Sequence, residues 1–338
     1  MMRRSLHYVI RVGDLMDSLC FYVGKLGMRV LRHEEFPHGC KATCNGPFGG
    51  KWSKTMVGYG PEDDHFVLEV VYNYGITSYD LGNFHAGFGI QSREAFAKVT
   101  AAGAQSDSSG VARVLDPNGY TFFISNADAK DPFRRVTLRV RDLNESREYY
   151  EQILGLKSSN IENDSISLSF SDDQVQLKFF SRVSKYFSVF SSINRSWIRR
   201  LRSRRRMRAY SFRLPNERSI RRVVFKLYCL YSCVVFKLAS IEKAAKQAGY
   251  NVLTSLTDLD TPGKATVSVV ILADPDGHEI CCVGDENYRA LSKWEPETEL
   301  VWKKAFSLSS KYRLINFTCF RKLTKRWLNL TAEFLHVQ

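Results

Sequence analysis

The sequence lacks an apolar run long enough to cross a bilayer. Its longest such run, Leu227 to Phe236, is bracketed by Lys226 and Lys237 and falls well short of the roughly 20 residues that a membrane-spanning helix needs. No apolar signal segment precedes the first expected strand, which starts close to Met1. We therefore expect a cytoplasmic protein, with a mitochondrial location as the alternative.

Cysteine pairs with the spacing of a structural zinc site are also missing. The eight cysteines are scattered, and Cys40 and Cys44, with three residues between them, are a weak signal alone. We expect reduced thiols in an intracellular compartment, where disulfides are rare. A phosphate-binding loop is absent too, because the glycine-rich stretch 46–50 does not end in Gly-Lys-Ser/Thr.

Most of the chain carries almost no net charge. The formal charge is +14, but residues 182–237 hold 16 Lys and Arg against the single acid Glu217, which leaves 33 bases and 34 acids elsewhere. The basic segment could bind nucleic acid or an anionic membrane, or act as a nuclear localisation signal. We favour the interpretation that 182–237 is foreign to the fold, either a late insertion or translated non-coding sequence. The tail from Trp302 is similar, with eight bases and one acid.

An internal repeat is the main feature that the sequence does have. Residues 11–28 and 139–156 align without a gap on R-V-x-D-L-x-x-S-x-x-[FY]-Y-x-x-x-L-G-[ML]. In each copy, an alternating strand pattern leads to an Asp that can cap a helix, and apolar residues then recur at helical spacing until a glycine. The pattern predicts a strand over 5–12 and helices over 14–26 and 143–154.

Two matching turns mark a second, shorter kind of unit. Asp116-Pro117-Asn118-Gly119 and Asp274-Pro275-Asp276-Gly277 place proline second and glycine fourth, as type I turns favour. Helices are predicted before them, over 93–102 and 240–248. The distance from the capping Asp to the turn is 102 residues in the first half and 132 in the second, so 30 extra residues fall in the basic segment.

These motifs, with the strand Glu69-Val70-Val71-Tyr72, resemble the glyoxalase I family of the vicinal oxygen chelate superfamily over roughly 1–180 and 240–295. The resemblance implies an α+β fold with tandem glyoxalase halves and four β-α-β-β-β units, each half forming curved open sheets around a cavity. The expected parts are a first domain at 1–128, a second at 133–290 interrupted by the basic insert 182–237, and a divergent basic tail at 300–338.

The resemblance also implies a divalent metal, zinc or nickel, held by a His or Gln on the first strand and a Glu on the last strand of each of two paired units. In the first unit these positions hold His7 and Glu69, and Glu69 would be the ligand carboxylate that moves the proton. The corresponding positions elsewhere hold Gly87, Phe123, Arg135, Lys178 and Cys281. Cations at two of them repel a metal. His85 and Glu279 share strand faces with these positions but are offset by two residues.

The expected function is that of a glyoxalase-I-like protein with an incomplete metal site. Two protein ligands are fewer than the three or four usual for zinc, so His7 and Glu69 are either a half-site or a buried pair in a binding pocket. We expect it to bind a small molecule such as a glutathione adduct, or to retain residual activity in methylglyoxal metabolism, with or without a metal. The alternative is an active lactoylglutathione lyase whose metal site is completed by other ligands, for example across a homodimer.

Overall fold

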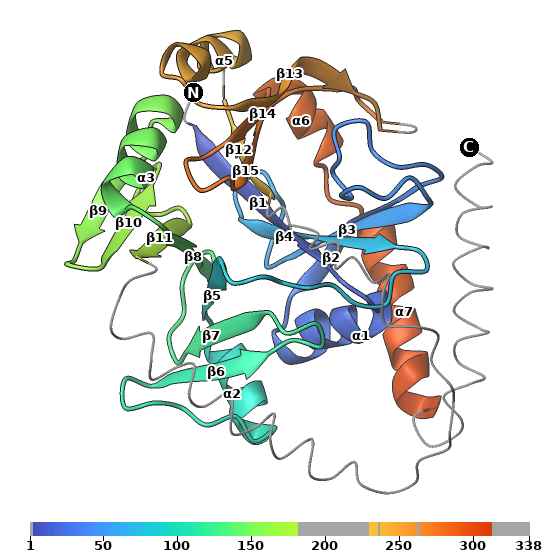
Figure 1. Cartoon of the computed structure of the whole chain (residues 1–338). Coiled ribbons are helices and arrows are strands. Elements are labelled where there is room, and N and C mark those ends of the chain that lie inside the picture. Colours follow the sequence, from blue (N-terminus) through green and yellow to red (C-terminus); the bar gives the residue numbers. More distant parts are fainter. Residues whose placement is uncertain (1–2, 182–229, 236, 262–263, 313–338) are drawn as a thin grey trace, which may run out of the picture.

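The computed structural model describes residues 3–181, 230–235, 237–261 and 264–312, which form two mixed sheets with helices packed on them (Figure 1). The eight-stranded sheet has the order β13 (Val252–Leu259), β14 (Val267–Ala273), β15 (Glu279–Val283), β12 (Leu230–Val234), β1 (Arg4–Arg11), β4 (Val67–Asn73), β3 (Trp52–Gly58) and β2 (Arg29–Phe36). The seven-stranded sheet has the order β6 (Val111–Leu115), β7 (Thr121–Ser125), β5 (His85–Gln91), β8 (Phe133–Val140), β11 (Gln176–Ser181), β10 (Ser165–Ser169) and β9 (Lys157–Ile161).

The helices follow the repeat. They are α1 (Leu15–Leu19), continued by the wider π-type turns of η1 (Cys20–Lys25), α2 (Arg93–Ala101), α3 (Leu143–Tyr149), continued by η2 (Tyr150–Leu154), α5 (Leu238–Gln247), α6 (Asp285–Leu291) and α7 (Pro296–Tyr312). None of the helices in the described part of the chain has the length and apolar character of a bilayer span. The helices predicted from the sequence are present, and in both copies of the repeat an α-helix continues as π-type turns.

Each sheet contains strands from both halves of the chain. The first strands of the first and fourth units, β1 and β12, pair antiparallel in one sheet, and β5 and β8 of the second and third units pair antiparallel in the other. This differs from the expectation that each half would form its own sheets. A sequence repeat shows which units are alike, but it does not show which first strands pair.

The repeated residues hold equivalent contacts in both halves. Asp14 and Asp142 cap their helices by accepting hydrogen bonds from backbone amides. Tyr22 then donates to Asp116, and Tyr150 donates to Asp274 with an Oη to Oδ2 distance of 3.2 Å. The motif therefore ties the helix of one unit to the Asp-Pro turn of the next.

The end of the basic segment belongs to the fold, which corrects the prediction that all of 182–237 is foreign to it. Leu230–Val234 forms β12, which lies between β15 and β1 in the middle of the eight-stranded sheet and not at an edge. Residues 182–229 lie outside the described residues. The tail from residue 300 also begins inside a regular element, because α7 starts at Pro296. This helix packs against β2, and Arg29 and Glu299 form a 2.7 Å ion pair between them.

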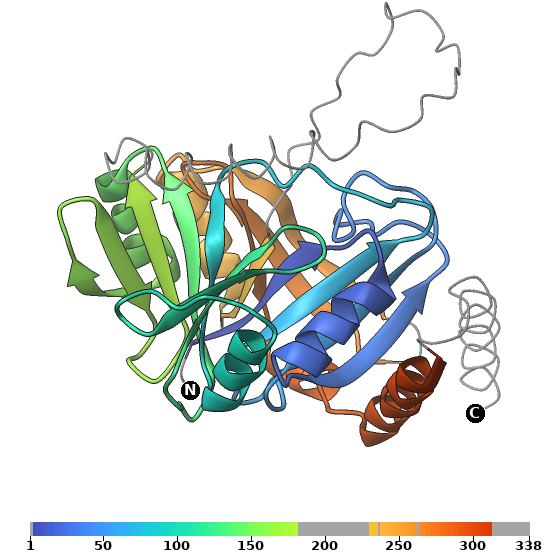
Figure 2. The same ribbon diagram turned by 90° about the horizontal axis from the view of Figure 1, so that it is seen from below.

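One continuous apolar core joins the two sheets on the faces that carry α1, α2, α3 and α5 (Figure 2). A second buried cluster lies on the opposite face of the eight-stranded sheet, where Leu6 and Val9 of β1 meet Ala42, Trp52 and residues of α6. His7 and Glu69 lie on this second face, each about 5% exposed. The candidate ligands are therefore buried under neighbouring side chains and do not line the open cavity that was expected.

Candidate functional site

His7 lies in a chain of buried polar groups. Its Nε2 is 3.4 Å from Oε2 of Glu69, and its Nδ1 is 3.3 Å from Oε1 of Glu62 and 3.0 Å from the hydroxyl of Tyr288. Tyr288 comes from α6 and donates to Oε1 of Glu62 over 2.6 Å. Arg32, fully buried on β2, completes the chain with a 3.0 Å ion pair to Glu62.

The hydrogen bond that Tyr288 donates to Glu62 indicates which nitrogen of the His7 ring carries a proton. Tyr288 gives its only proton to Glu62, so its oxygen accepts from Nδ1 of His7. In the neutral ring, Nε2 then presents a lone pair to the carboxylate of Glu69. In this tautomer, Nε2 of His7 and Oε2 of Glu69 face each other as two atoms that can bind a cation.

Neighbouring groups hold Glu62 ionised despite its burial. Burial alone would raise its pKa, but Arg32 and the contacts with His7 and Tyr288 outweigh it and lower the pKa below the ordinary value. A carboxylate at the second nitrogen of a histidine also fixes the tautomer, an arrangement typical of histidines that bind metals. The first unit therefore supplies two oriented donors with a supporting carboxylate.

The paired unit does not supply the other two donors. Glu69 lies beside Val9, two residues after His7 on β1, and Cys281 lies beside Ser232 on β12. By this register, Leu230 holds the position in β12 that His7 holds in β1, and a leucine has no donor atom. Burial raises the pKa of the Cys281 thiol, with Cys233 and Glu69 adding to the shift, so this sulfur is a protonated thiol and a poor ligand.

Glu279 is a further carboxyl group on this face. It lies on β15 two residues before Cys281 and is 7% exposed, and its carboxyl makes no hydrogen bond or ion pair with the residues that the structure describes. Burial raises the pKa of Glu279 to about 7, although the positive charge of Arg11 acts in the opposite direction. This acid therefore changes its charge near neutral pH.

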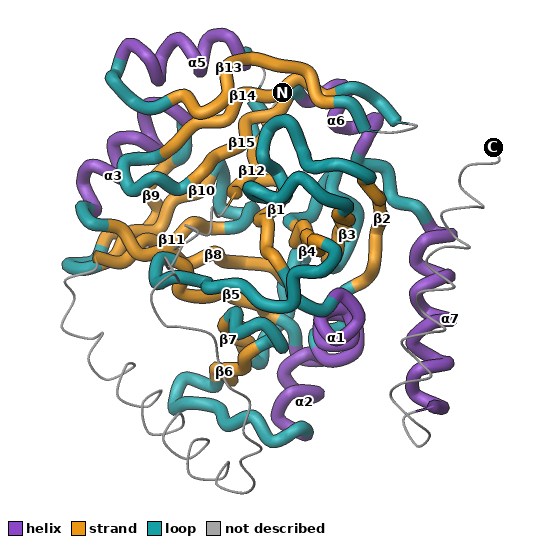
Figure 3. The backbone as a smooth tube through the Cα atoms, turned by 45° about the vertical axis from the view of Figure 1, so that its right-hand side comes forward, coloured by secondary structure: helices purple, strands orange, loops and turns teal. Residues whose placement is uncertain are grey.

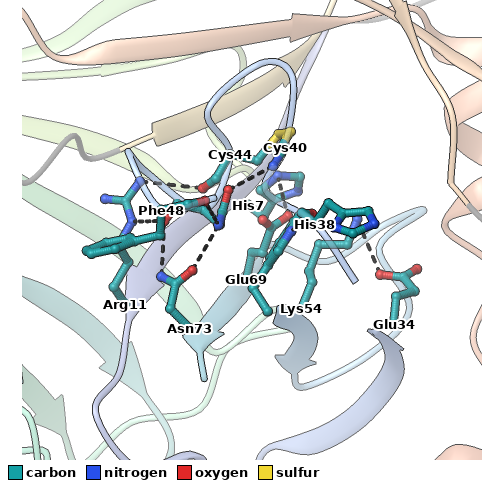
Figure 4. Close-up of a disulfide and its surroundings, with 12 residues drawn as sticks. His7, Arg11, Glu34, His38, Cys40, Cys44, Phe48, Lys54, Glu69 and Asn73 are labelled. Atoms are coloured by element: carbon teal, nitrogen blue, oxygen red, sulfur yellow. Dashed lines mark hydrogen bonds and ion pairs between the residues drawn. A yellow bond between two sulfur atoms is a disulfide. The ribbon is translucent and has the colours of Figure 1, made fainter. Parts of the chain in front are cut away.

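A loop of the first unit covers this face. The connection from β2 to β3 docks through Asn45, whose side-chain amide donates to Oδ1 of Asn73 over 2.9 Å. Arg11 donates from Nε to the carbonyl of Asn45 over 3.3 Å and from Nη2 to that of Cys44 over 3.4 Å (Figure 4). In Figure 3 the loop crosses the sheet beside β1 and β4. A ligand reaching His7 from this side must therefore displace the loop.

A disulfide closes the covering loop. Cys40 and Cys44 are bonded, with their Cα atoms 5.5 Å apart, which corrects the expectation of reduced thiols for these two residues. The short spacing hid the pair, because it resembles neither a zinc motif nor a disulfide framework. Cys20, Cys233 and the vicinal pair 281–282 are not part of a disulfide, and the other two cysteines lie outside the described residues.

The donor set does not fit the four-ligand metal centre that the resemblance implies. His7 and Glu69 are two of the residue types that such a centre uses, whereas Cys281 offers a protonated thiol and the register position equivalent to His7 falls on a leucine, Leu230. Within the described ranges, no group of three His, Cys, Asp or Glu side chains is arranged to hold a metal ion. The structure therefore brings together two of the side chains that the resemblance implies, His7 and Glu69.

Comparison with known proteins shows the family. Residues 4–134 match the model of the Glyoxalase/Bleomycin resistance protein/Dioxygenase superfamily, and residues 222–291 match that of the glyoxalase domain-containing protein 4-like C-terminal domain. Glyoxalase domain-containing protein 4 of Rattus norvegicus is 40% identical over 301 residues, which cover 87% of this chain and 90% of that protein. This chain belongs to the glyoxalase domain-containing protein 4 family.

Other relatives of this chain support the same family and fold. Glyoxalase 1 of Caenorhabditis elegans is 40% identical over 299 residues, covering 88% of this chain and 94% of that protein. The crystal structure of glyoxalase I from Zea mays has a TM-score of 0.59 at 22% identity and covers 85% of this chain and 94% of that one. The α+β fold and the resemblance to glyoxalase I are thus confirmed, and the match from residue 222 agrees with the place of β12 in the fold.

In the second unit, the two positions that correspond to metal ligands hold Gly87 and Phe123, which pack against each other. Phe123 fills the space beside Gly87, where an added Cβ would lie 2.6 Å from the phenyl ring. His85 faces the apolar core against Tyr8 and Phe88, and burial lowers its pKa to about 3. Neither ligand position of this unit, nor the offset histidine, faces His7.

Two partners of His7 were not predicted from the sequence. Glu62 lies in the turn between β3 and β4, and Tyr288 lies in α6, beyond the last repeated element. No motif marks either position, and only the fold brings them to His7. Neither of two described pockets reaches this site: one of about 290 Å³ lies beside Trp302, and one of about 250 Å³ beside Phe21.

Proposed function

We propose that this chain is a glyoxalase-I-like protein with an incomplete metal site that binds a small molecule of the glutathione-adduct type, with at most residual activity in methylglyoxal metabolism. One observation carries the proposal: in the paired first and fourth units, only His7 and Glu69 keep donor side chains at the ligand positions, opposite Leu230 and Cys281. The relatives named above support a carbonyl or glutathione-adduct substrate class.

The covering loop would control access to this site. Arg11 and Asn73 now bind the loop backbone and Asn45, so both groups become available as donors when the loop moves away. A guanidinium and an amide suit the carboxylates of a glutathione adduct. Glu69 would then lie beside the bound molecule as the carboxylate that can accept a proton.

The metal content of the purified chain tests the proposal directly. The parent chain and a His7→Ala/Glu69→Ala variant are equilibrated with zinc or nickel, and bound metal is measured after gel filtration. We expect clearly less than one equivalent in the parent chain, because two ligands hold a divalent ion weakly. His65→Ala/Glu94→Ala, which removes the same residue types outside the site, is the matched control.

Ligand binding forms the second arm of the test. Calorimetric titration with an S-alkyl glutathione should show binding to the parent chain and to the control variant. The His7→Ala/Glu69→Ala variant should bind at least tenfold more weakly. Equal binding by all three chains would place the ligand elsewhere and refute the proposal.

An active, metal-dependent lactoylglutathione lyase is the second candidate function. The carboxylate of Glu62 at the second nitrogen of His7 favours it, because metal-binding histidines carry such a partner. Near-stoichiometric zinc or nickel in the parent chain, lost in His7→Ala/Glu69→Ala and kept in the control, would support this function over the first. Lyase assays on the loaded chain would then show whether the remaining ligands come from a second molecule.

A further inference from the structure

The seven-stranded sheet carries a half-buried cation for which the described residues supply no partner. Arg135 lies on β8, and among the described residues no hydrogen bond or ion pair reaches its guanidinium, whose Nε is buried. Burial lowers the pKa of Arg135, and the negative charge of Glu162 offsets this only in part. An unpaired buried charge is unfavourable, so this position needs an explanation other than stability.

The neighbouring strand is shaped around this side chain. Gly89 on β5 pairs with Arg135, and a Cβ added there would lie 3.0 Å from Cβ and 3.3 Å from Nε of the arginine. Any larger residue would push the guanidinium away from its place. The glycine thus leaves the Arg135 side chain the room to lie along the face of β5.

A second cation lies on the same face. Lys178 on β11 pairs with Thr137 in register, two residues from the pairing of Gln176 with Arg135, so the two cations lie on adjacent strands with their Cα atoms roughly 8 Å apart from strand spacing. The ammonium of Lys178 is 3.4 Å from Glu162, whose side chain is 48% exposed. Ser167 on β10, which is buried, pairs with Lys178 and adds a hydroxyl.

The other charges on this face leave Arg135 uncompensated. Arg139, the next arginine along β8, already donates to the carbonyls of Asn83 and His85. Glu162 is the acid that contacts this part of the sheet, and it also binds Ser165 and Asn160. The positive charges of β8 and β11 therefore exceed the negative charge near them.

We propose that Arg135 and Lys178 form a binding site for the oxyanion of a small molecule, a phosphate monoester or a carboxylate, on the seven-stranded sheet. The guanidinium of Arg135 provides a planar fork of free donors, which matches both groups, and Lys178 adds a second positive charge beside Ser167. This site is separate from His7 and Glu69, which lie on the other sheet. The units that lost their metal ligands would thus have gained a site of opposite charge preference.

Titration calorimetry of the full chain tests this site with two probes, inorganic phosphate and succinate, at constant ionic strength in chloride. We expect at least one probe to bind, and Arg135→Met to weaken that binding at least tenfold. Arg134→Met is the matched control, because Arg134 is the adjacent arginine and already donates to the carbonyls of Asp172 and Asp173. The affinity of this variant should stay within twofold of the parent. Tighter binding of phosphate or of succinate identifies which oxyanion the site prefers.

The unfolding temperature of Arg135→Met distinguishes a binding role of Arg135 from a structural one. Because Arg135 is unpaired, Arg135→Met should unfold at the same temperature as the parent chain or higher, although it binds the probe more weakly. Lys178→Met provides an independent variant, and His7→Ala/Glu69→Ala should bind the probe as the parent does. The proposal is overturned if neither probe binds, if Arg135→Met and Lys178→Met bind like the parent, or if Arg134→Met loses as much affinity.

Discussion

At the scale of single residues, Glu62 is the group on which the environment of His7 most depends. It is 1% exposed and binds Arg32, His7 and Tyr288 together. Glu62→Ala would leave the charge of Arg32 with less compensation in the interior, so we expect the free energy of unfolding to fall by about 3–5 kcal/mol. Guanidinium chloride unfolding measures this change.

Glu94→Ala is the control for the Glu62 prediction. Glu94 is exposed and pairs with Lys98 one turn along α2, so its loss should cost less than about 0.5 kcal/mol. If both variants unfold at the same denaturant concentration, the buried network contributes nothing to stability and the geometry around His7 must be set by other contacts.

The carboxyl group of Glu279 should make stability depend on pH. Burial raises the pKa of Glu279 from 4.5 to about 7 in the folded chain, so the folded state binds this proton more tightly than the unfolded state. That advantage is complete below the unfolded pKa and is lost as the pH rises through the folded pKa. Between about pH 5 and pH 8, the parent chain should therefore lose stability relative to Glu279→Gln.

Thermal unfolding at several pH values measures the Glu279 effect. Glu286→Gln, which removes an exposed carboxyl from α6, should keep the pH slope of the parent chain. A slope for Glu279→Gln equal to that of the parent would mean that Glu279 is solvated and already ionised at pH 5.

Residue types at motif positions were predictable, and their environment was not. His7 and Glu69 occupy the ligand positions that the resemblance to glyoxalase I implies, and the structure places Nε2 of His7 3.4 Å from Oε2 of Glu69. Glu62 and Tyr288 reach the same face from a turn and a late helix, and Arg11 of β1 binds the covering loop. No spacing rule connects these segments. The sequence therefore indicated which donors remain but not what surrounds them.

At the scale of elements, β12 shows where the pattern failed. Its residues, Leu230 to Val234, lie at the end of a segment in which arginine and serine are frequent, so they were predicted to be foreign to the fold. The strand pairs with both β1 and β15, and its side chains at Tyr231 and Cys233 are buried in the main core. A strand of five residues is too short to stand out from a basic flank by composition, whereas the pairing with both neighbouring strands fixes its position in the sheet.

A proline in β12 tests its central position. Ser232→Pro removes a backbone donor between two paired strands, so we expect a loss of at least about 3 kcal/mol in the free energy of unfolding. Ser255→Pro is the matched control, since Ser255 is exposed on the edge strand β13, where the register to β14 shifts. Equal effects from the two substitutions would show that β12 is not held within the sheet.

At the scale of the whole molecule, the two halves complete each other. The eight-stranded sheet needs β1 of the first half beside β12 of the second, and the seven-stranded sheet needs β5 beside β8. The tandem organisation was predictable from the repeat, but the pairing was not, because units of the same kind have equivalent strand edges. Lys264 adds a contact of the same kind, since this residue of the second half lies 3.3 Å from Glu34 and bridges it to Glu295.

This interleaving predicts how the chain behaves when it is cut. We expect residues 1–129 alone to give no cooperatively folded monomer, because β1 and β5 would each expose an unpaired edge. Coexpressed with residues 130–338, the same fragment should be recovered with a tag on the other piece, since two strand pairings and a common core join them. Gel filtration and thermal unfolding measure both outcomes. A monomeric 1–129 fragment with a sharp unfolding transition would show that the first half is an independent domain, and the half-site of His7 and Glu69 would then have to be explained within that half alone.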